Sequence, residues 1–277
     1  NIPFILSTVS TASIETISEI TAGKLWFQLY HPMDEGLLDD ILRRCEAAAV
    51  EVLVLLCDVP TFGYRAADIR NGLAMPPKMT LANIGQIGGR PEWALKTLLN
   101  GSPSFETLKP YMKSNMDMRQ LATFMDNTFD GRLDTQKIAA IRDKWKGKLV
   151  LKGVATESDV AQAIQLGVDG VIVSNHGGRQ LDAGQSSIAA LNPIVTRYAD
   201  QITIMMDSGI RSGPDIARSL ACGAEFTFLG RAFMYSVAAL GAKGGEHAIE
   251  MLTMQLRQVM EQLCCARPAE LHRHLVC

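Results

Sequence analysis

Apolar and polar positions follow two spacings along this chain. Short runs such as 51–56 and 170–174 are almost entirely apolar, which predicts buried strands covered on both faces. Segment 34–49 instead has apolar residues three and four positions apart, which predicts a helix with one buried stripe. That stripe comprises Leu37, Leu38, Ile41, Leu42 and Cys45.

The two spacings alternate over most of the sequence. The predicted strands are 2–6, 25–29, 51–56, 149–152, 170–174, 202–206 and 226–229. The predicted helices are 14–20, with Ser13 as N-cap, then 34–49, 93–99, 118–125, 135–145, 158–166, 187–198, 213–221 and 244–263. Such alternation predicts an α/β fold with a parallel sheet. Polar and glycine residues after nearly every strand favour a TIM (β/α)8 barrel over a doubly wound sheet, because barrel enzymes build their sites there.

Only seven of the eight strands of such a barrel are visible in the pattern. The chain starts at Asn1 and enters an apolar, strand-like segment by Ile2. We therefore expect it to begin at the second strand, with the first strand and helix absent, and to form one barrel domain over residues 1–277.

Segment 61–147 interrupts the alternation with many glycines and prolines. Long insertions in compact domains commonly serve as lids or binding loops. We expect a mobile lid whose distal half, around 75–111, is a docking surface for a neighbouring subunit or a membrane, because apolar residues are frequent there. The alternative is a solvated loop without a role.

Composition narrows the class of protein. The chain has 277 residues, 47% of them hydrophobic, and a formal net charge of −2, which suits a soluble domain and does not favour nucleic acid as a partner. Its apolar runs are shorter than the ~20 residues that span a bilayer, although peripheral membrane contact stays open. Six cysteines without CxxC spacing predict reduced thiols in a cytoplasmic protein, and we expect no metal.

The stretch 171–182 concentrates the candidate chemistry. A short apolar run ends at Ser174, and His176, two glycines, Arg179 and a carboxylate follow within a few residues. Histidine titrates near neutrality and suits a proton acceptor, while arginine has the planar fork that fits a carboxylate. Taken alone, the stretch also fits a polar turn whose side chains cap neighbouring elements.

Polar residues at the other strand ends complete the candidate site. If these ends meet on one rim, they bring together Ser7, Gln28, Tyr30, Asp58, Arg65, Lys152, Ser174, His176, Arg179, Asp207, Arg211 and Arg231. Asp58 could then hold His176 in one tautomer. The loops at 207–213 and 229–231 follow the last two strands, where barrels commonly bind phosphate. No GxGxxG fingerprint precedes a helix, which argues against a nicotinamide dinucleotide fold.

Several motifs resemble the FMN-dependent L-2-hydroxy acid oxidases and dehydrogenases, the family of glycolate oxidase, bacterial L-lactate dehydrogenase, mandelate dehydrogenase and flavocytochrome b2. SNHGGRQLD at 174–182 is highly specific to that family. Four further motifs agree in order and spacing, namely FQLY at 27–30, LKGV at 151–154, DSGIRSG at 207–213 and LGRAF at 229–233. The resemblance runs from Ile2 to the C-terminal region.

The resemblance implies FMN as cofactor and a role for each matching residue. It makes His176 the catalytic base and Asp58 its partner, with Arg179 and Arg65 on the substrate carboxylate and Tyr30 in contact with the substrate. It assigns Ser7, Gln28, Lys152 and Ser174 to the flavin ring. It assigns Asp207, Gly209, Arg211, Gly230 and Arg231 to the ribityl phosphate.

The leading hypothesis is therefore FMN-dependent oxidation of an L-2-hydroxy acid to the 2-oxo acid. L-lactate is favoured because Val9 stands where glycolate oxidases have a bulkier aromatic residue, and because segments 91–94 and 99–101 resemble the lactate dehydrogenases. The alternatives are an FMN barrel like type 2 isopentenyl diphosphate isomerase, or an inert fragment. We expect O₂, a quinone or a cytochrome as electron acceptor, a homo-oligomer (a tetramer), and a cytoplasmic protein that associates with the inner membrane face if the docking surface is used.

Overall fold

The fold was analysed in a computed structural model, which describes residues 2–61, 65–72, 80–101, 104–113, 116 and 118–275. The chain divides into two compact units. The first unit comprises Asn1–Leu56 and Pro60–Leu133, and the second comprises Cys57–Val59 and Asp134–Cys277. Asp58 therefore belongs to the second unit, although β3, the strand before it, belongs to the first. That the chain acts as a single domain stays a prediction.

Three parallel strands organise the first unit. They are β1 (Phe4–Ser7), β2 (Leu25–Leu29) and β3 (Val52–Leu56), joined by α1 (Ile14–Thr21) and α2 (Glu35–Ala47). Ser13 caps α1 as predicted, because its hydroxyl accepts the Thr16 N–H at 3.2 Å. The predicted stripe of α2 is buried, and every residue of β3 is buried, so both expectations from the apolar pattern are confirmed.

The remainder of the first unit is helical. It contains α3 (Ala66–Arg70), α4 (Leu81–Gly88), α5 (Pro91–Asn100), the 3₁₀ turn η1 (Lys109–Tyr111) and α6 (Met118–Thr128). The apolar pattern did not predict α3 or α4, because α3 has only five residues and Gly85 and Gly88 weaken the helical signal of α4. Other parts of the expected lid, at 62–64, 73–79, 102–103, 114–115 and 117, lie outside the described residues.

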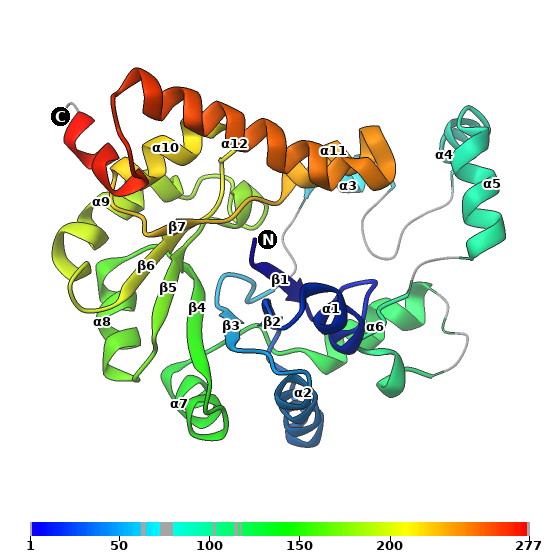
Figure 1. Ribbon diagram of the computed structural model, residues 1–277. Helices are drawn as coiled ribbons and strands as arrows, with labels where there is room; N and C mark the ends of the chain where they lie inside the picture. Colours follow the sequence, from blue (N-terminus) through cyan, green and yellow to red (C-terminus); the bar gives the residue numbers. More distant parts are fainter. Residues whose placement is uncertain are drawn as a thin grey trace. The chain divides into compact units, whose positions relative to one another are not determined.

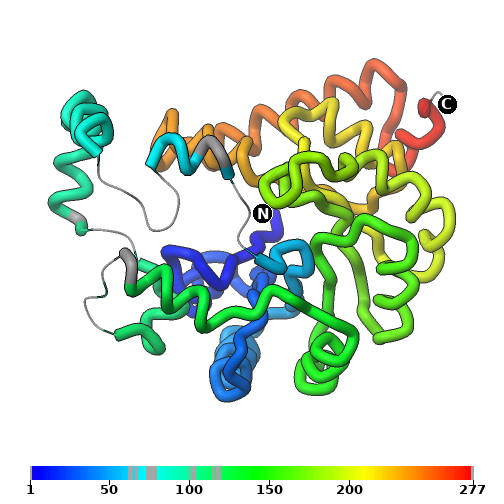
Figure 2. The backbone as a smooth tube through the Cα atoms, turned by 180° about the vertical axis from the view of Figure 1, so that it is seen from behind, coloured from blue at the N-terminus to red at the C-terminus, as the bar shows by residue number. Residues whose placement is uncertain are grey.

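Four parallel strands organise the second unit. They are β4 (Lys148–Val154), β5 (Gly170–Val173), β6 (Thr203–Met206) and β7 (Phe226–Thr227). The helices are α7 (Thr135–Lys144), α8 (Glu157–Gln165), α9 (Ser187–Tyr198), α10 (Gly213–Ala221), α11 (Arg231–Leu240) and α12 (Gly244–Gln262). Helices α8 and α9 lie along one side of β4–β6 (Figures 1 and 2). Helix α12 packs against α10 and α11, and the turn η4 (Pro268–His274) packs against α10.

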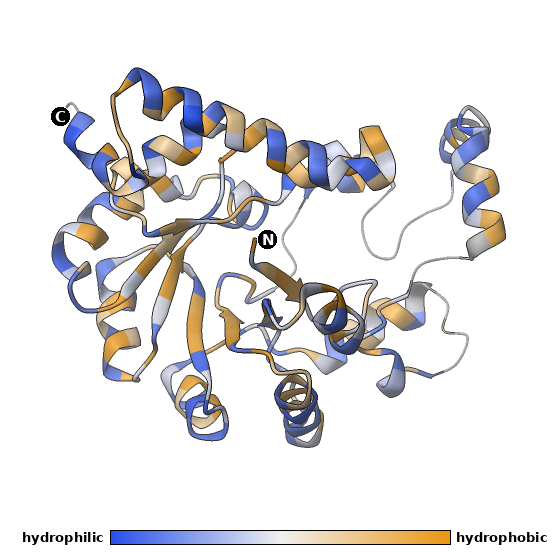
Figure 3. Cartoon of the chain, viewed as in Figure 1, coloured by the Kyte–Doolittle hydropathy of each residue, from blue (hydrophilic) through white to orange (hydrophobic). Residues whose placement is uncertain are grey.

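The apolar pattern located every strand of the second unit and missed one helix. Strands β4 to β6 are largely hydrophobic (Figure 3), as segments covered on both faces must be. Strand β7 ends at Thr227, two residues earlier than predicted, and α11 was not predicted. On α12 the apolar spacing predicts a buried stripe of Ile249, Leu252, Leu256, Val259 and Leu263. The prediction is wrong for Ile249, which is 40% exposed, whereas Leu252 is buried and the other three are partly buried against a core cluster.

Candidate active site

His176 lies on a tight turn directly after β5. The buried Ser174 ends the apolar run, and its hydroxyl accepts the backbone N–H of His176 at 3.1 Å. His176 starts the 3₁₀ turn η2 (His176–Gly178) with a φ of +55°, which is an uncommon conformation for a residue that carries a Cβ. Backbone strain of this kind is often found at functional sites.

Asp58 and His176 are neighbours, although 118 positions separate them in the sequence. Asp58 Oδ1 lies 3.0 Å from His176 Nδ1, and the other carboxylate oxygen is buried without a hydrogen-bond partner among the described residues. The Asp58 carboxylate can accept a hydrogen bond from a protonated Nδ1, which leaves Nε2 as the basic nitrogen of the ring. The geometry thus suits a base with a fixed tautomer.

Gly153 allows Asp58 to take this position. The register of β4 shifts at this residue, whose φ is +98°. A Cβ on Gly153 would lie 2.6 Å from the Asp58 side chain, so any larger residue would displace the carboxylate. The glycine of the LKGV motif therefore leaves the space that the Asp58 side chain occupies.

Lys152, which is buried, forms a second pair in the same unit. Its Nζ lies 2.9 Å from Asp207 Oδ2 and donates to Ser174 Oγ at 3.0 Å, although the residue is only 9% exposed. A buried ammonium persists only when it is paired and hydrogen-bonded, and here both conditions are met. Strands β4, β5 and β6 thereby bring three of the predicted site residues together.

The predicted phosphate loops leave backbone groups open. Gly209 has a φ of +78°, and Gly230 is the N-cap of α11. A Cβ at either glycine would meet no heavy atom within 4 Å, and no side chain caps α11. A helix N-terminus without a side-chain cap, with Arg231 as its first residue, fits a phosphate. These residues therefore fit the anionic end of FMN.

Ser208, to which the sequence analysis assigned no role, connects the turn at His176 with Asp207. Ser208 Oγ accepts the N–H of Gly177 at 2.9 Å and donates to Asp207 Oδ1 at 2.8 Å. Arg231 donates from Nη2 to the carbonyl of Gly177 at 2.9 Å. The only sequence signal for Ser208 is its place in DSGIRSG, and nothing in that motif reveals a partner 31 residues away.

The remaining site residues of the second unit are more exposed. Arg179 is exposed and ends the η2 turn, where its backbone N–H bonds the carbonyl of His176 at 3.4 Å. Arg211 is also exposed, and its backbone N–H bonds Asp215 at 3.1 Å. The roles of both arginines stay predictions.

Four predicted site residues belong to the first unit. Ser7 ends β1, and Gln28 and Tyr30 lie two residues apart at the end of β2. The hydroxyl of Thr8 bonds the Gln28 carbonyl at 2.8 Å and accepts the Tyr30 N–H at 3.1 Å. The Tyr30 ring packs edge-on against Phe129 with 5.9 Å between centroids. Arg65 precedes α3 and is half-buried. The roles of these four residues stay predictions.

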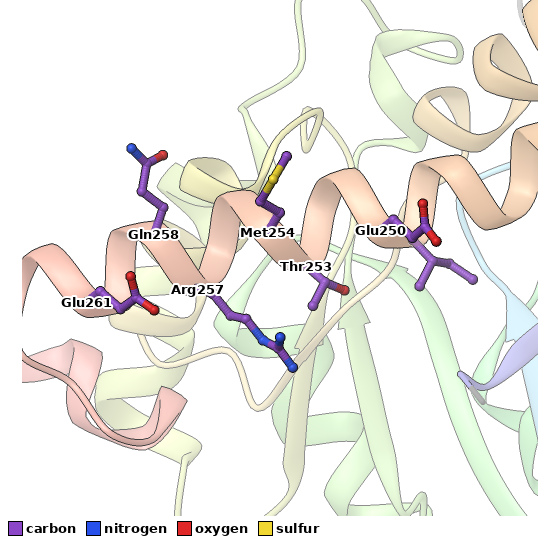
Figure 4. A pocket seen from close by; sticks show the side chains of 7 residues that line it. Glu250, Thr253, Met254, Arg257, Gln258 and Glu261 are labelled. Carbon is purple, nitrogen blue, oxygen red and sulfur yellow. The ribbon is translucent and has the colours of Figure 1, made fainter.

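Other features of the described residues do not compete with this site. A surface hollow along α12 (Figure 4) is lined by side chains of that helix alone, none of which is a predicted site residue. No cluster of three metal-ligating side chains occurs in the part of the chain that the structure describes. None of the described helices combines the length and apolar content that a membrane crossing requires.

Comparison with known proteins agrees with this geometry. The sequence model of the family described as FMN-dependent dehydrogenase matches residues 1–277. The chain belongs to this family, and it is an enzyme of the FMN-dependent 2-hydroxy acid dehydrogenase and oxidase class.

Two curated relatives show which members of the family the chain resembles. The chain is 38% identical over 260 residues to an L-lactate dehydrogenase of Xanthobacter autotrophicus, covering 94% of this chain and 67% of the relative. It is 36% identical over 273 residues to an L-lactate dehydrogenase of Vibrio parahaemolyticus, covering 98% of this chain and 72% of the relative.

Solved structures support the fold as well. A monotopic membrane protein, (S)-mandelate dehydrogenase, is 33% identical with a TM-score of 0.91 over 98% of this chain and 71% of that chain. A mandelate oxidase with benzoyl-formic acid is 30% identical with a TM-score of 0.76 over 98% of this chain and 68% of its own. The predicted (β/α) barrel class is confirmed, with seven strands within the described residues.

Proposed function

We propose that the protein oxidises L-lactate, or an L-2-hydroxy acid of similar size, to the 2-oxo acid. The observation that carries the proposal is the Asp58–His176 pair at 3.0 Å, which provides a base where the family performs its reaction. The choice of L-lactate is supported by 36–38% identity to L-lactate dehydrogenases and by Val9, whose small side chain leaves room beside the substrate.

In the proposed reaction His176 acts on the substrate hydroxyl. Its Nε2 accepts the hydroxyl proton, and the Asp58 carboxylate stabilises the imidazolium that forms. Arg179 binds the substrate carboxylate, and Arg65 is the second proposed donor to it. When bound, FMN would supply the acceptor for the α-hydrogen and the two electrons that leave the substrate as the alcohol becomes a carbonyl group.

Different residues are proposed to hold the phosphate and the ring of FMN. Gly209 and Gly230 are proposed to hold the phosphate, because a ligand can approach their backbone groups, and Arg231 is proposed to add a positive charge at the uncapped start of α11. Lys152 is proposed to lie beside the flavin ring, where its buried charge favours the electron-rich form.

The substrate assignment is tested by flavin bleaching. The full-length protein with FMN bound is mixed anaerobically with L-lactate, D-lactate, glycolate and L-mandelate. We expect bleaching by L-lactate with the highest kcat/KM of the four and none by D-lactate. A flavin that no 2-hydroxy acid bleaches would overturn the reaction, whereas faster turnover of glycolate or mandelate would overturn only the choice of lactate.

We also propose that α4 and α5 dock on a membrane, from which a quinone takes the electrons. None of the described side chains of residues 81–99 is buried, and Leu81, Leu98 and Leu99 are 88%, 81% and 74% exposed. Exposed apolar residues this numerous mark a contact surface. A membrane is favoured over a second subunit because a relative of TM-score 0.91 is a monotopic membrane protein.

A deletion separates docking from catalysis. Residues Gly85 to Leu99 are replaced by a short Gly/Ser linker in the full-length protein. We expect flavin reduction by substrate to survive, while vesicle binding and reoxidation by a vesicle-bound quinone are lost. Loss of assembly with unchanged vesicle binding would assign the surface to a subunit contact instead, and no change in any of these would refute a docking role.

A further inference from the structure

Gly177, the residue after His176, is held through both of its backbone groups. Its N–H donates to Ser208 Oγ at 2.9 Å, and its carbonyl accepts from Arg231 at 2.9 Å. A Cβ on Gly177 would lie 2.2 Å from Arg231 Nη2, so a larger residue would break this arrangement. The direction in which His176 leaves the backbone is therefore set by groups outside its own loop.

Ser208 has an unusual backbone for this task. Its φ is +76°, a conformation that glycine adopts freely and that costs a residue with a Cβ. Its hydroxyl donates to Asp207 Oδ1 at 2.8 Å, so a lone pair is available for the Gly177 N–H. Asp207 in turn pairs with Lys152 at 2.9 Å, so one side chain connects the lysine pair to the histidine loop.

We propose that Ser208 is a positioning residue, which holds the Gly177 peptide so that the His176 ring stays against Asp58 with Nε2 directed at the substrate. The hydroxyl, rather than the backbone conformation, carries this role. The inference rests on the proposed function of His176 as the base, and it assigns the contribution of a residue that makes no contact with the Asp58–His176 hydrogen bond itself.

Two variants separate the hydroxyl from the backbone strain. Ser208→Gly removes the hydroxyl and relieves the positive φ, whereas Ser208→Ala removes the hydroxyl and keeps the strain. We expect both to lower the rate of flavin reduction at saturating substrate by about 10- to 100-fold, since small displacements of a reacting group have this effect. KM and the affinity for FMN should stay near the wild-type values, and the glycine variant should be at least as stable as the wild type.

A matched control removes strain elsewhere. Ala49 has a φ of +52° between α2 and β3, so Ala49→Gly relieves a comparable conformation without touching the histidine loop. We expect wild-type rates from this control. Ser208→Asn retains an acceptor on a residue that tolerates positive φ, and it should recover part of the rate.

A readout without substrate keeps this inference distinct from the proposed reaction. With five histidines in the chain, ¹⁵N NMR of the apoprotein can follow the His176 ring. We expect one Nδ1-protonated tautomer in the wild type and averaged tautomers in Ser208→Gly. A wild-type protein that fails to bleach would overturn the proposed function alone. Wild-type rates in Ser208→Gly, an unchanged ring spectrum, or a rate loss matched by lost FMN affinity would overturn the role of Ser208.

Discussion

Two regions of this molecule depart from the rule that polar side chains are exposed and apolar side chains are buried. One buries polar groups, and the other exposes apolar ones. Strand β4 and the loop after β5 bury the polar residues Lys152 and Ser174, which are hydrogen-bonded to each other, and Lys152 also forms an ion pair with Asp207 after β6. Helices α4 and α5 expose leucines such as Leu81 and Leu98. A buried polar group needs its partners within the fold, whereas an exposed apolar group acquires one later. The first region is where we place the proposed chemistry, and the second is the proposed docking surface.

The largest expected effect comes from removing the base. His176→Gln keeps a polar side chain on the η2 turn but takes away the proton acceptor. The rate of flavin reduction should fall by about 10²- to 10⁴-fold, the usual contribution of a general base. Stopped-flow absorbance measures this rate, and the FMN spectrum of the variant serves as control for cofactor binding. A variant that retains the wild-type rate would remove His176 from the reaction.

Breaking the lysine pair tests whether the buried polar region depends on its internal partners. Lys152→Met leaves the half-buried Asp207 carboxylate, whose side chain is 18% exposed, without its counter-charge, which should destabilise the apoprotein by about 2–3 kcal/mol. Lys152→Met combined with Asp207→Asn should recover much of this loss, because no unpaired charge remains. Urea unfolding of the apoprotein gives both values. Equal stability of the single and double variants would contradict the argument.

The sequence predicted the skeleton of the fold because strands covered on both faces leave a strong apolar signal. Strand β2 was predicted with its exact bounds and α9 and α10 likewise. Helices α4 and α11 were missed for different reasons. Glycines weaken the pattern of α4, and α11 follows Gly230 directly with apolar residues on several sides.

The candidate site, like the fold, was predicted only in part from the sequence. The motifs identified His176 and Lys152, and the end of the apolar run 51–56 identified Asp58. The structure then described the Asp58–His176 and Lys152–Asp207 pairs. The motifs did not identify the contact between Ser208 and Gly177, because a hydrogen bond across 31 residues depends on two turns with positive φ. Residue type is readable from a sequence, but the direction of a peptide N–H is not.

The exposed region predicts a loss of binding without a loss of stability. Leu98→Ser with Leu99→Ser removes two side chains that are 81% and 74% exposed, so the free energy of unfolding should change by less than about 0.5 kcal/mol. Partition onto lipid vesicles should fall at least about tenfold, since each buried leucine contributes roughly 1.5–3 kcal/mol.

A conservative change on the same helix provides the control. Thr97→Ser alters a half-buried polar residue of α5 and should leave vesicle flotation unchanged. Equal flotation of the leucine variant and the wild type would show that these leucines do not contact lipid.

The smallest expected effect concerns a polar cluster outside both regions. Arg44 of α2 donates to Glu15 of α1 at 2.8 and 3.0 Å and to the carbonyl of the buried Thr107 at 2.7 Å. The hydrogen bonds from Arg44 lower the pKa of Glu15 from 4.5 to about 2. None of these residues is a predicted site residue. The cluster therefore tests whether breaking a hydrogen-bonded polar group away from the site affects activity.

Glu15→Gln should therefore cost stability and leave the rate of flavin reduction unchanged. Because the folded-state pKa lies below the ordinary value, the contribution of Glu15 is fully present above pH 4.5 and is lost as pH falls towards 2. The Glu15 side chain is half exposed, so solvent screening limits the contribution to about 0.5–1 kcal/mol. Urea unfolding of wild type and variant at several pH values between 7 and 3 measures the difference, which should stay constant above pH 4.5 and narrow below it. A difference that stays constant down to pH 3 would mean that the Glu15 side chain stabilises the contact between α1 and α2 by packing and not by its charge.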